Sequence, residues 1–232
     1  MKKNAWIGLV VAVVAVASLI VAVLLLTAPR GDEGGDPDAG STPTPSSSSG
    51  AQTGCNAGSS DATTPPADLS WTATDGVTWP VSETAGPTAE VEGHPVCFER
   101  SRAGAALFAV NFFTTVMVGG SDLRDVVDFY TVESPGKPAL LDSVPASGGN
   151  ADSAAQWTAG GLSIAGYKID AYSPERVSLH TVVSVPQSAT GYTGFPMTVV
   201  WSEGDWKLEP LDDGSSGQPI PVTSDEFTKW SG

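Results

Sequence analysis

The stretch "VVWSEGDWKL", Val199–Leu208, predicts two strands joined by a tight turn. With Glu203-Gly204 at the turn, Trp201 faces Trp206 across the ladder. Side chains alternate along a strand, so the two indoles share the apolar face of the hairpin. Such a face must be buried on something, and we expect the aromatic pair to close a hydrophobic core. The alternative is a clamp that binds a ligand or peptide.

The remaining strands are predicted from the same period of two. Residues 162–172, 176–185 and 194–202 alternate apolar and polar side chains, and the turn hairpin adds the last strand. Together they predict a four-strand antiparallel meander. On the last strand, the charged side chains alternate to the face opposite the tryptophans, and we expect them to be solvated: Asp205, Lys207 and Glu209.

Helices are predicted ahead of the strands. Ser101 can cap a helix that runs to about Val118, and its body is apolar nearly all round, which is typical of a buried helix. Its polar exception, Asn111, is interpreted as a hydrogen-bonded core amide, with a pocket-lining role as the alternative. An amphipathic helix over 121–130 and a short one ending at Gly160 follow. The predicted fold class is α+β, with helices packed on a curved, cone-like antiparallel sheet.

The N-terminus predicts a membrane anchor. Residues 5–28 carry no charge, and as a helix they would be roughly 36 Å long, enough to cross a hydrocarbon core of about 30 Å. A cleaved signal peptide is the alternative, although its apolar region is normally shorter. Lys2 and Lys3 precede the run and acidic residues follow it, so residues 1–4 are expected in the cytoplasm and the bulk of the chain outside.

Composition divides the rest of the chain. Residues 29–68 are rich in Pro, Ser, Gly and Asp and have almost no apolar side chains, which predicts a disordered linker. We expect an extended entry arm over 69–100, the α+β domain over 101–211 and a C-terminal tail over 212–232.

Two cysteines, Cys55 and Cys97, are the only ones in the chain. Both fall on the extracytoplasmic side, a compartment that permits disulfides, so we predict that they are bridged. Two free thiols are the alternative. A bridge would pin the linker to the domain at Cys55.

Charge and motif content narrow the function classes. The formal net charge is −15, from 26 acidic and 11 basic residues, which repels phosphate backbones, so we expect no nucleic-acid partner. Asp170 and His180 are candidate general bases, but alternation places each on the more polar face of its strand, and we interpret His180 as a surface histidine. His94 lies in a loop without an obvious partner. No metal-ligand spacing or phosphate loop is found, so no catalytic residue, cofactor or metal is expected.

The order of elements resembles the nuclear transport factor 2-like cone fold over about Arg100 to Leu211. A narrower set of motifs is similar to an uncharacterised actinobacterial family of membrane-anchored proteins: "PVSETAGPT", "CFERSRAGAALFAVNFF", "YSPERVSLHTVV", "VVWSEGDWKL" and "FTKWSG". That family is often encoded with conjugation machinery and has no defined active site.

The resemblance implies a non-enzymatic structural or assembly subunit of a cell-envelope machine, as in conjugal transfer by type IV secretion-like systems. Expected partners are the membrane and other envelope or conjugation proteins, and self-association is compatible with the sequence. The alternative is a tethered module that binds a small molecule, a peptide or a wall component. A cone-fold enzyme is a third hypothesis, which a carboxylate or histidine inside an open cavity would favour.

Overall fold

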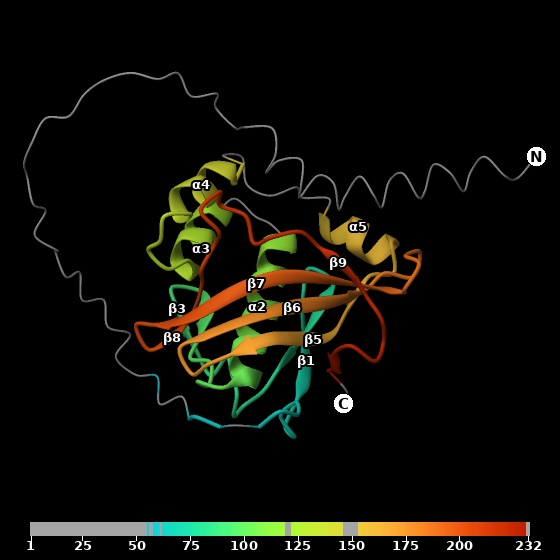
Figure 1. The fold of residues 1–232 in the computed structure, drawn as a ribbon, viewed down its shortest axis with the longest axis horizontal. Helices are drawn as coiled ribbons and strands as arrows, with labels where there is room; N and C mark the ends of the chain where they lie inside the picture. Colours follow the sequence, from blue (N-terminus) through green and yellow to red (C-terminus); the bar gives the residue numbers. More distant parts are fainter. Residues whose placement is uncertain (1–54, 56–57, 61, 119–121, 146–152, 231–232) are drawn as a thin grey trace, which may run out of the picture.

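The computed structural model describes residues 55, 58–60, 62–118, 122–145 and 153–230. This part of the chain is an α+β fold with a mostly antiparallel sheet and four helices (Figure 1), so the predicted fold class is confirmed at that level. None of these four helices combines the length and apolar character that a bilayer-spanning helix needs. The anchor predicted at 5–28, and the linker as far as residue 54, lie outside the described residues.

The main sheet has six antiparallel strands. Its elements are β5 (Ser163–Tyr172), β6 (Arg176–Ser184), β7 (Tyr192–Ser202), β8 (Asp205–Leu208), β9 (Ile220–Val222) and β10 (Thr228–Lys229). The strand order is β10-β5-β6-β7-β8, and β9 pairs with β7 at the end of β7 that β8 does not reach. The predicted meander of four strands is therefore present as β5 to β8.

The segment that the sequence assigns to an entry arm forms two hairpins. The first pairs β1 (Ser70–Thr74) with β2 (Val77–Val81), and the second pairs β3 (Ala89–Val91) with β4 (His94–Val96). All five residues of β1 are exposed, whereas Val77 and Trp79 of β2 join the hydrophobic core. The arm is thus held to the domain through β2.

Helix α2 (Arg102–Val118) is the centre of the fold, and thirteen of its 17 residues are buried, as its uniformly apolar sequence predicts. At its start, the Ser101 hydroxyl oxygen accepts a hydrogen bond from the Gly104 N–H at 3.1 Å, which confirms the predicted cap. The shorter helices are α3 (Leu123–Tyr130), α4 (Lys137–Ser143) and α5 (Ser153–Ala159). Helix α4 is not among the predicted helices; it has Pro138 in its first turn, where proline is favoured.

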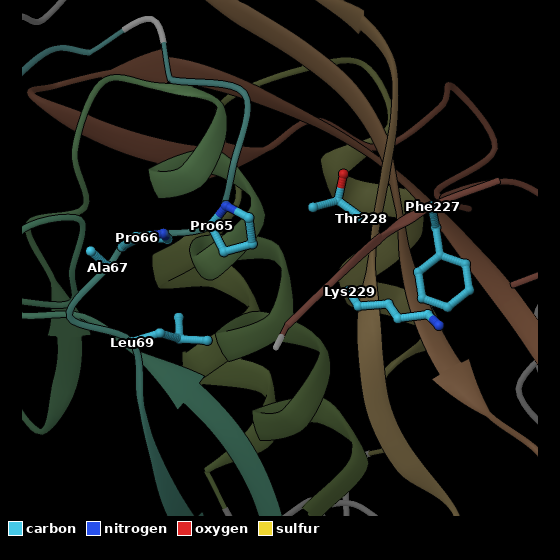
Figure 2. Close-up of a pocket in the computed structure, with 7 residues that line it drawn as sticks. All are labelled: Pro65, Pro66, Ala67, Leu69, Phe227, Thr228 and Lys229. Carbon is cyan, nitrogen blue, oxygen red and sulfur yellow. The ribbon is translucent and has the colours of Figure 1, made fainter. Parts of the chain in front are cut away.

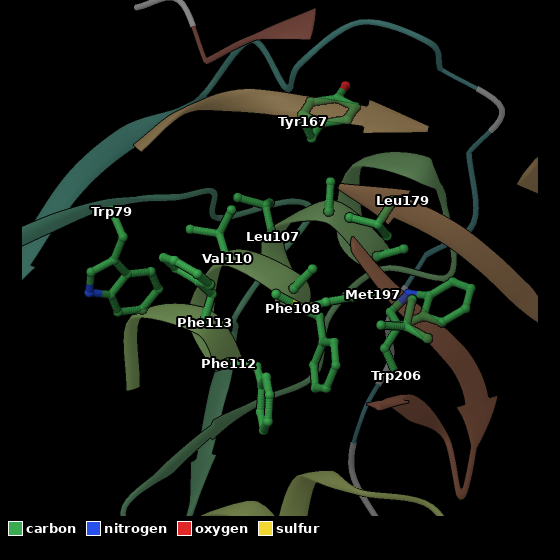
Figure 3. Close-up of a cluster of buried hydrophobic side chains, with 14 of the residues drawn as sticks. Trp79, Leu107, Phe108, Val110, Phe112, Phe113, Tyr167, Leu179, Met197 and Trp206 are labelled. Carbon is green, nitrogen blue, oxygen red and sulfur yellow. The ribbon is translucent and has the colours of Figure 1, made fainter. Parts of the chain in front are cut away.

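The core lies between α2 and the sheet (Figure 3), and large side chains from both fill it. Phe108 of α2 makes edge-to-face contacts with Phe98 and Tyr130, at ring-centroid distances of 5.6 and 5.7 Å. Leu179 and Met197 approach from β6 and β7. Offset and perpendicular aromatic pairs of this kind add about 0.5–1.5 kcal/mol each beyond the area that they bury.

The C-terminal residues belong to the sheet, which differs from the tail expected over 212–232. Strands β9 and β10 add to β7 and β5, and Trp230 is buried. Gly194 shows how closely this segment packs, because a Cβ there would lie 2.9 Å from a methyl group of Val222. Strands of two or three residues carry too little periodicity to be predicted from sequence.

Candidate functional site

The turn between β7 and β8 has the register that the sequence predicts, with Trp201 opposite Trp206. Glu203 and Gly204 have φ angles of 55° and 86°, the left-handed pair of a tight hairpin turn. Trp206 is completely buried, and its Nε1 donates a hydrogen bond to the Glu99 carbonyl oxygen at 2.8 Å. Trp201 is half-buried at the rim of the core, and its ring meets that of Trp206 edge-on at 5.3 Å.

Asp205 is buried, which corrects the expectation that it is solvated. Its carboxylate accepts hydrogen bonds from the backbone N–H groups of Cys97 at 2.7 Å, Phe98 at 3.0 Å and Trp206 at 2.9 Å. Burial raises the pKa of Asp205, although these three donors favour the charged form. The side chain therefore ties the hairpin to the segment that follows β4.

Lys207 is also buried rather than solvated. Its Nζ donates a hydrogen bond to the Phe129 carbonyl oxygen at 2.7 Å and lies 4.2 Å from the centre of the Phe129 ring. Burial lowers the pKa of Lys207. Glu209, the third charged residue expected on this face, is partly buried and forms an ion pair with Arg176. Strand β8 is thus covered on both faces.

Cys55 and Cys97 form the predicted disulfide, with their Cα atoms 5.1 Å apart. Cys97 has a φ of 68°, and its N–H points to the Asp205 carboxylate. The end of the predicted linker is therefore joined covalently to Cys97, and Cys97 is joined by hydrogen bonds to the β7–β8 hairpin.

The disulfide is testable in protein isolated without reductant from the cells that make it. Peptide mapping without reductant should find one linked species that contains Cys55 and Cys97, because an oxidising compartment retains a bridge of this kind. The same map after reduction and alkylation, in which both peptides should run separately, is the control. Complete alkylation of both thiols without reductant would show that the bridge does not form in cells.

Asp170 and His180 are brought together, with Oδ2 of Asp170 at 2.9 Å from Nδ1 of His180. His180 is only 8% exposed, so the expectation of a surface histidine is wrong. The C-terminal segment covers the sheet on both sides of this strand: Val222 lies against Gly194 of β7, and Phe227 lies against Gly166 of β5. The pair lies on the face of β6 opposite Leu179, which points into the core.

Acidification should destabilise the domain through His180. Burial lowers its pKa, with a smaller contribution from Lys168 in the same direction and an opposing one from Asp170. As the pH falls through about 6.5, the unfolded chain takes up a proton that the folded chain does not. The free energy of unfolding should therefore fall from about pH 6.5 down to the folded-state pKa.

Denaturant titrations of the parent and of His180→Gln, at about pH 7.5 and about pH 5.5, measure this dependence. His180→Gln should lose less stability than the parent between the two values. Ser178→Ala, two residues away on the same face, has no group that titrates in this range and serves as the control. Equal losses in the parent and His180→Gln would contradict the assignment.

The other polar candidates stand apart from this pair. Asn111 is 1% exposed within the core, and its Nδ2 has no hydrogen-bond acceptor among the described residues. His94 lies on β4 with its ring 4.4 Å from that of Phe129. Within the described part of the chain, no three His, Cys, Asp or Glu side chains gather as a metal site.

An open cleft of about 600 Å³ lies at the margin of the domain (Figure 2). One side is formed by the chain just before β1, which includes Pro65, Pro66 and Leu69, and the other by Phe227, Thr228 and Lys229. The sequence does not predict this site, because its two sides are about 160 positions apart in the chain and carry no shared motif.

Comparison with known proteins gives a family but no activity. Neither the curated proteins nor the solved structures contain a match to the chain. A family model matches residues 34–229, which span most of the predicted linker over 29–68 and nearly all of the described fold. The chain therefore belongs to the family described as Domain of unknown function (DUF8175).

Proposed function

We propose that this chain is a single-pass membrane protein whose extracytoplasmic domain is a structural or assembly subunit of a cell-envelope machine. The observation that carries the proposal is the filled interior. Large side chains of α2 fill it: Leu107 lies on the side of Tyr167 of β5, and Phe108 and Phe112 pack against Tyr130 of α3 (Figure 3). A domain with a packed core presents its surface to partners, whereas a carrier of small molecules encloses most of its ligand, and the cleft described above is open and lies at the margin.

The joint at Cys97 supports the same proposal. The disulfide fits an oxidising compartment outside the cytoplasm. Through Asp205, the joint connects the linker directly to the hairpin that closes the core. In a protein anchored at residues 5–28, with its N-terminus in the cytoplasm, this joint would shorten the free part of the linker and keep the domain close to the membrane.

Two finer parts of the proposal rest on resemblance. Helices followed by an antiparallel meander support a nuclear transport factor 2-like cone. The motif likeness to membrane-anchored proteins encoded with conjugation machinery supports a place in conjugal transfer. Neither part is required by the packed core, and the experiments below do not depend on them.

Protease treatment of intact, wall-stripped cells tests the anchor. The protease should remove the domain, and untreated protein should stay in the membrane through alkaline carbonate washing. A cytoplasmic protein followed in the same cells is the control for integrity. Release of a shortened mature chain into the medium would show that residues 5–28 are a cleaved signal peptide and not an anchor.

Crosslinking in membranes, followed by purification under denaturing conditions, tests the assembly role. Specific envelope proteins should be recovered with the native chain. The matched control joins the same residues 1–54 to an unrelated folded domain, and it should recover none of them. Recovery of the same proteins by both chains, or of none by either, would overturn the assembly role.

A further inference from the structure

The cleft at the margin of the domain has two firmly held sides. Pro65 and Pro66 form part of one side, and their fixed φ angles limit its movement. Shortly after them, the Asp68 carboxylate accepts hydrogen bonds from the Ser82 hydroxyl at 2.8 Å and the Thr84 N–H at 2.9 Å. The other side is β10, paired with β5 through Thr228 and Lys229. The cleft is therefore a built feature and not a gap beside a loose arm.

Strand β10 is an edge strand. It stands first in the order of the sheet, so in the described part of the chain only its side toward β5 is paired. An edge strand presents unpaired backbone N–H and C=O groups, which an extended peptide can satisfy by adding as a further strand. Beside such an edge, the apolar surfaces of Leu69 and Phe227 provide contacts for the side chains of the added strand.

Two buried donors adjoin this strand without good acceptors. Trp230, directly after β10, is 4% exposed, and its Nε1 has no hydrogen-bond partner among the described residues. Tyr167, opposite Thr228 in the ladder, is 2% exposed; its hydroxyl lies near that of Thr228 but makes no well-formed hydrogen bond within the described part. The two rings are 4.5 Å apart. Both side chains belong to the hydrophobic core and neither lines the cleft, so they report on the state of β10 rather than contact a ligand directly.

A positively charged side chain also lies at the cleft. Lys229 is exposed, and no carboxylate of the described residues lies at ion-pair distance from it. In a chain of net charge −15, an exposed cation without an ion-pair partner in the described part of the chain is a specific feature. The free edge of β10 and this cation together select an extended ligand that carries negative charge.

We propose that this cleft binds an extended acidic peptide segment of a partner protein, which adds as a strand to β10 and places a carboxylate at Lys229. The inference rests on the proposed assembly function and names the chemistry of the partner. A peptide fits better than a small anion, because an edge strand can pair along a backbone and a small anion uses none of it.

A matched pair of synthetic peptides tests the site on the full chain in detergent micelles. Both are blocked at the termini and alternate Thr and Val, and they differ only in a central Glu or Lys. The chain is labelled with ¹⁵N, and the readout is the indole N–H resonance of Trp230, assigned with a Trp230→Phe variant. The Glu peptide should shift this resonance in a saturable way, and the Lys peptide should bind more weakly.

Charge reversal at the cleft gives the second arm. Lys229→Glu should weaken binding of the Glu peptide by about tenfold or more and favour the Lys peptide. Lys168→Glu changes the same charge on the neighbouring strand β5, outside the cleft, and should leave binding as in the parent. Lys229 is exposed, so the spectrum of the variant should show that it is folded.

Three results of the peptide experiments would overturn the inference. They are a Trp230 resonance that neither peptide shifts, equal affinity for both peptides, and equal binding by the parent and Lys229→Glu. Concentration-dependent dimerisation that Lys229→Glu abolishes would assign the cleft to a second copy of this chain and also overturn it. If crosslinked partners are recovered while the peptides fail, the assembly function stands and this site does not.

Discussion

Replacement of Trp206 by alanine is expected to lower the free energy of unfolding by about 3–5 kcal/mol, because it removes the largest fully buried side chain of the core and leaves a cavity. It also leaves the carbonyl oxygen of Glu99 without the hydrogen bond from the indole N–H. Domains have a stability of about 5–15 kcal/mol, so the variant should melt far below the parent or fail to fold. Thermal and denaturant unfolding of the folded domain measure the change.

Glu203→Asn is the matched control on the same hairpin. Glu203 is exposed and has a φ of 55°, which asparagine adopts more readily, and Asn-Gly is a preferred pair for this turn. Its stability should stay within about 0.5 kcal/mol of the parent or rise slightly. Lys207→Ala would be a poor control, since Lys207 is buried and bonded to Phe129.

The alternative role of the two tryptophans predicts the opposite result. If they form a binding clamp, Trp206→Ala should melt close to the parent and lose partner recruitment. Trp201 is half-buried, and the guanidinium of Arg100 lies 5.5 Å from the centre of its ring. Trp201→Ala should therefore cost less stability than Trp206→Ala, and an equal or greater loss would contradict the division into core and rim.

Periodicity in the sequence predicts which segments form helices and strands better than it predicts which side chains are buried. The run of apolar residues in α2 and the alternation over β5 to β8 each carry enough residues to define one period. The turn at Glu203-Gly204 then fixes the register of the last pair. These features are local, so a single sequence contains them.

Predictions about exposure fail where a second surface covers a strand. Alternation separates the two faces of β8 correctly, but it cannot tell that Asp205 and Lys207 meet partners that lie far away in the chain. Charged residues are rarely buried unless they are paired, so solvation was the natural expectation. His180 fails for the same reason, because strands too short to predict bring the C-terminal segment against the sheet.

The candidate cleft could not be predicted from the sequence either, and the reason is again physical. Tyr167 and Trp230, the buried neighbours of β10, count as core residues in the periodicity, and only the structure shows that their polar atoms lack well-formed hydrogen bonds within the described part. Lys229 reads as one more surface charge until the fold places it beside Pro65 and Leu69. A binding surface assembled from distant segments has no sequence signature other than its parts.

Asp205→Ala is expected to destabilise the domain by about 3–5 kcal/mol, although the mutation removes a charge from the interior. The cost arises from the donors left behind. The N–H groups of Cys97, Phe98 and Trp206 all point to this carboxylate in a buried site, and each unsatisfied buried donor costs about 1–3 kcal/mol. Denaturant unfolding, with the disulfide intact in both proteins, isolates this contribution.

Asp213→Ala is the matched control, because Asp213 also accepts a backbone hydrogen bond, from the Ser215 N–H at 2.9 Å, but is exposed to water. Water replaces the lost acceptor there, so the loss should be about 1 kcal/mol or less. Asp205→Asn should fall between the parent and Asp205→Ala, since its amide keeps one acceptor oxygen and sets an NH₂ group against the donors. If Asp205→Ala unfolds like Asp213→Ala, the carboxylate does not hold the hairpin to Cys97. The disulfide would then connect the linker to Cys97 but not, through Asp205, to the hairpin.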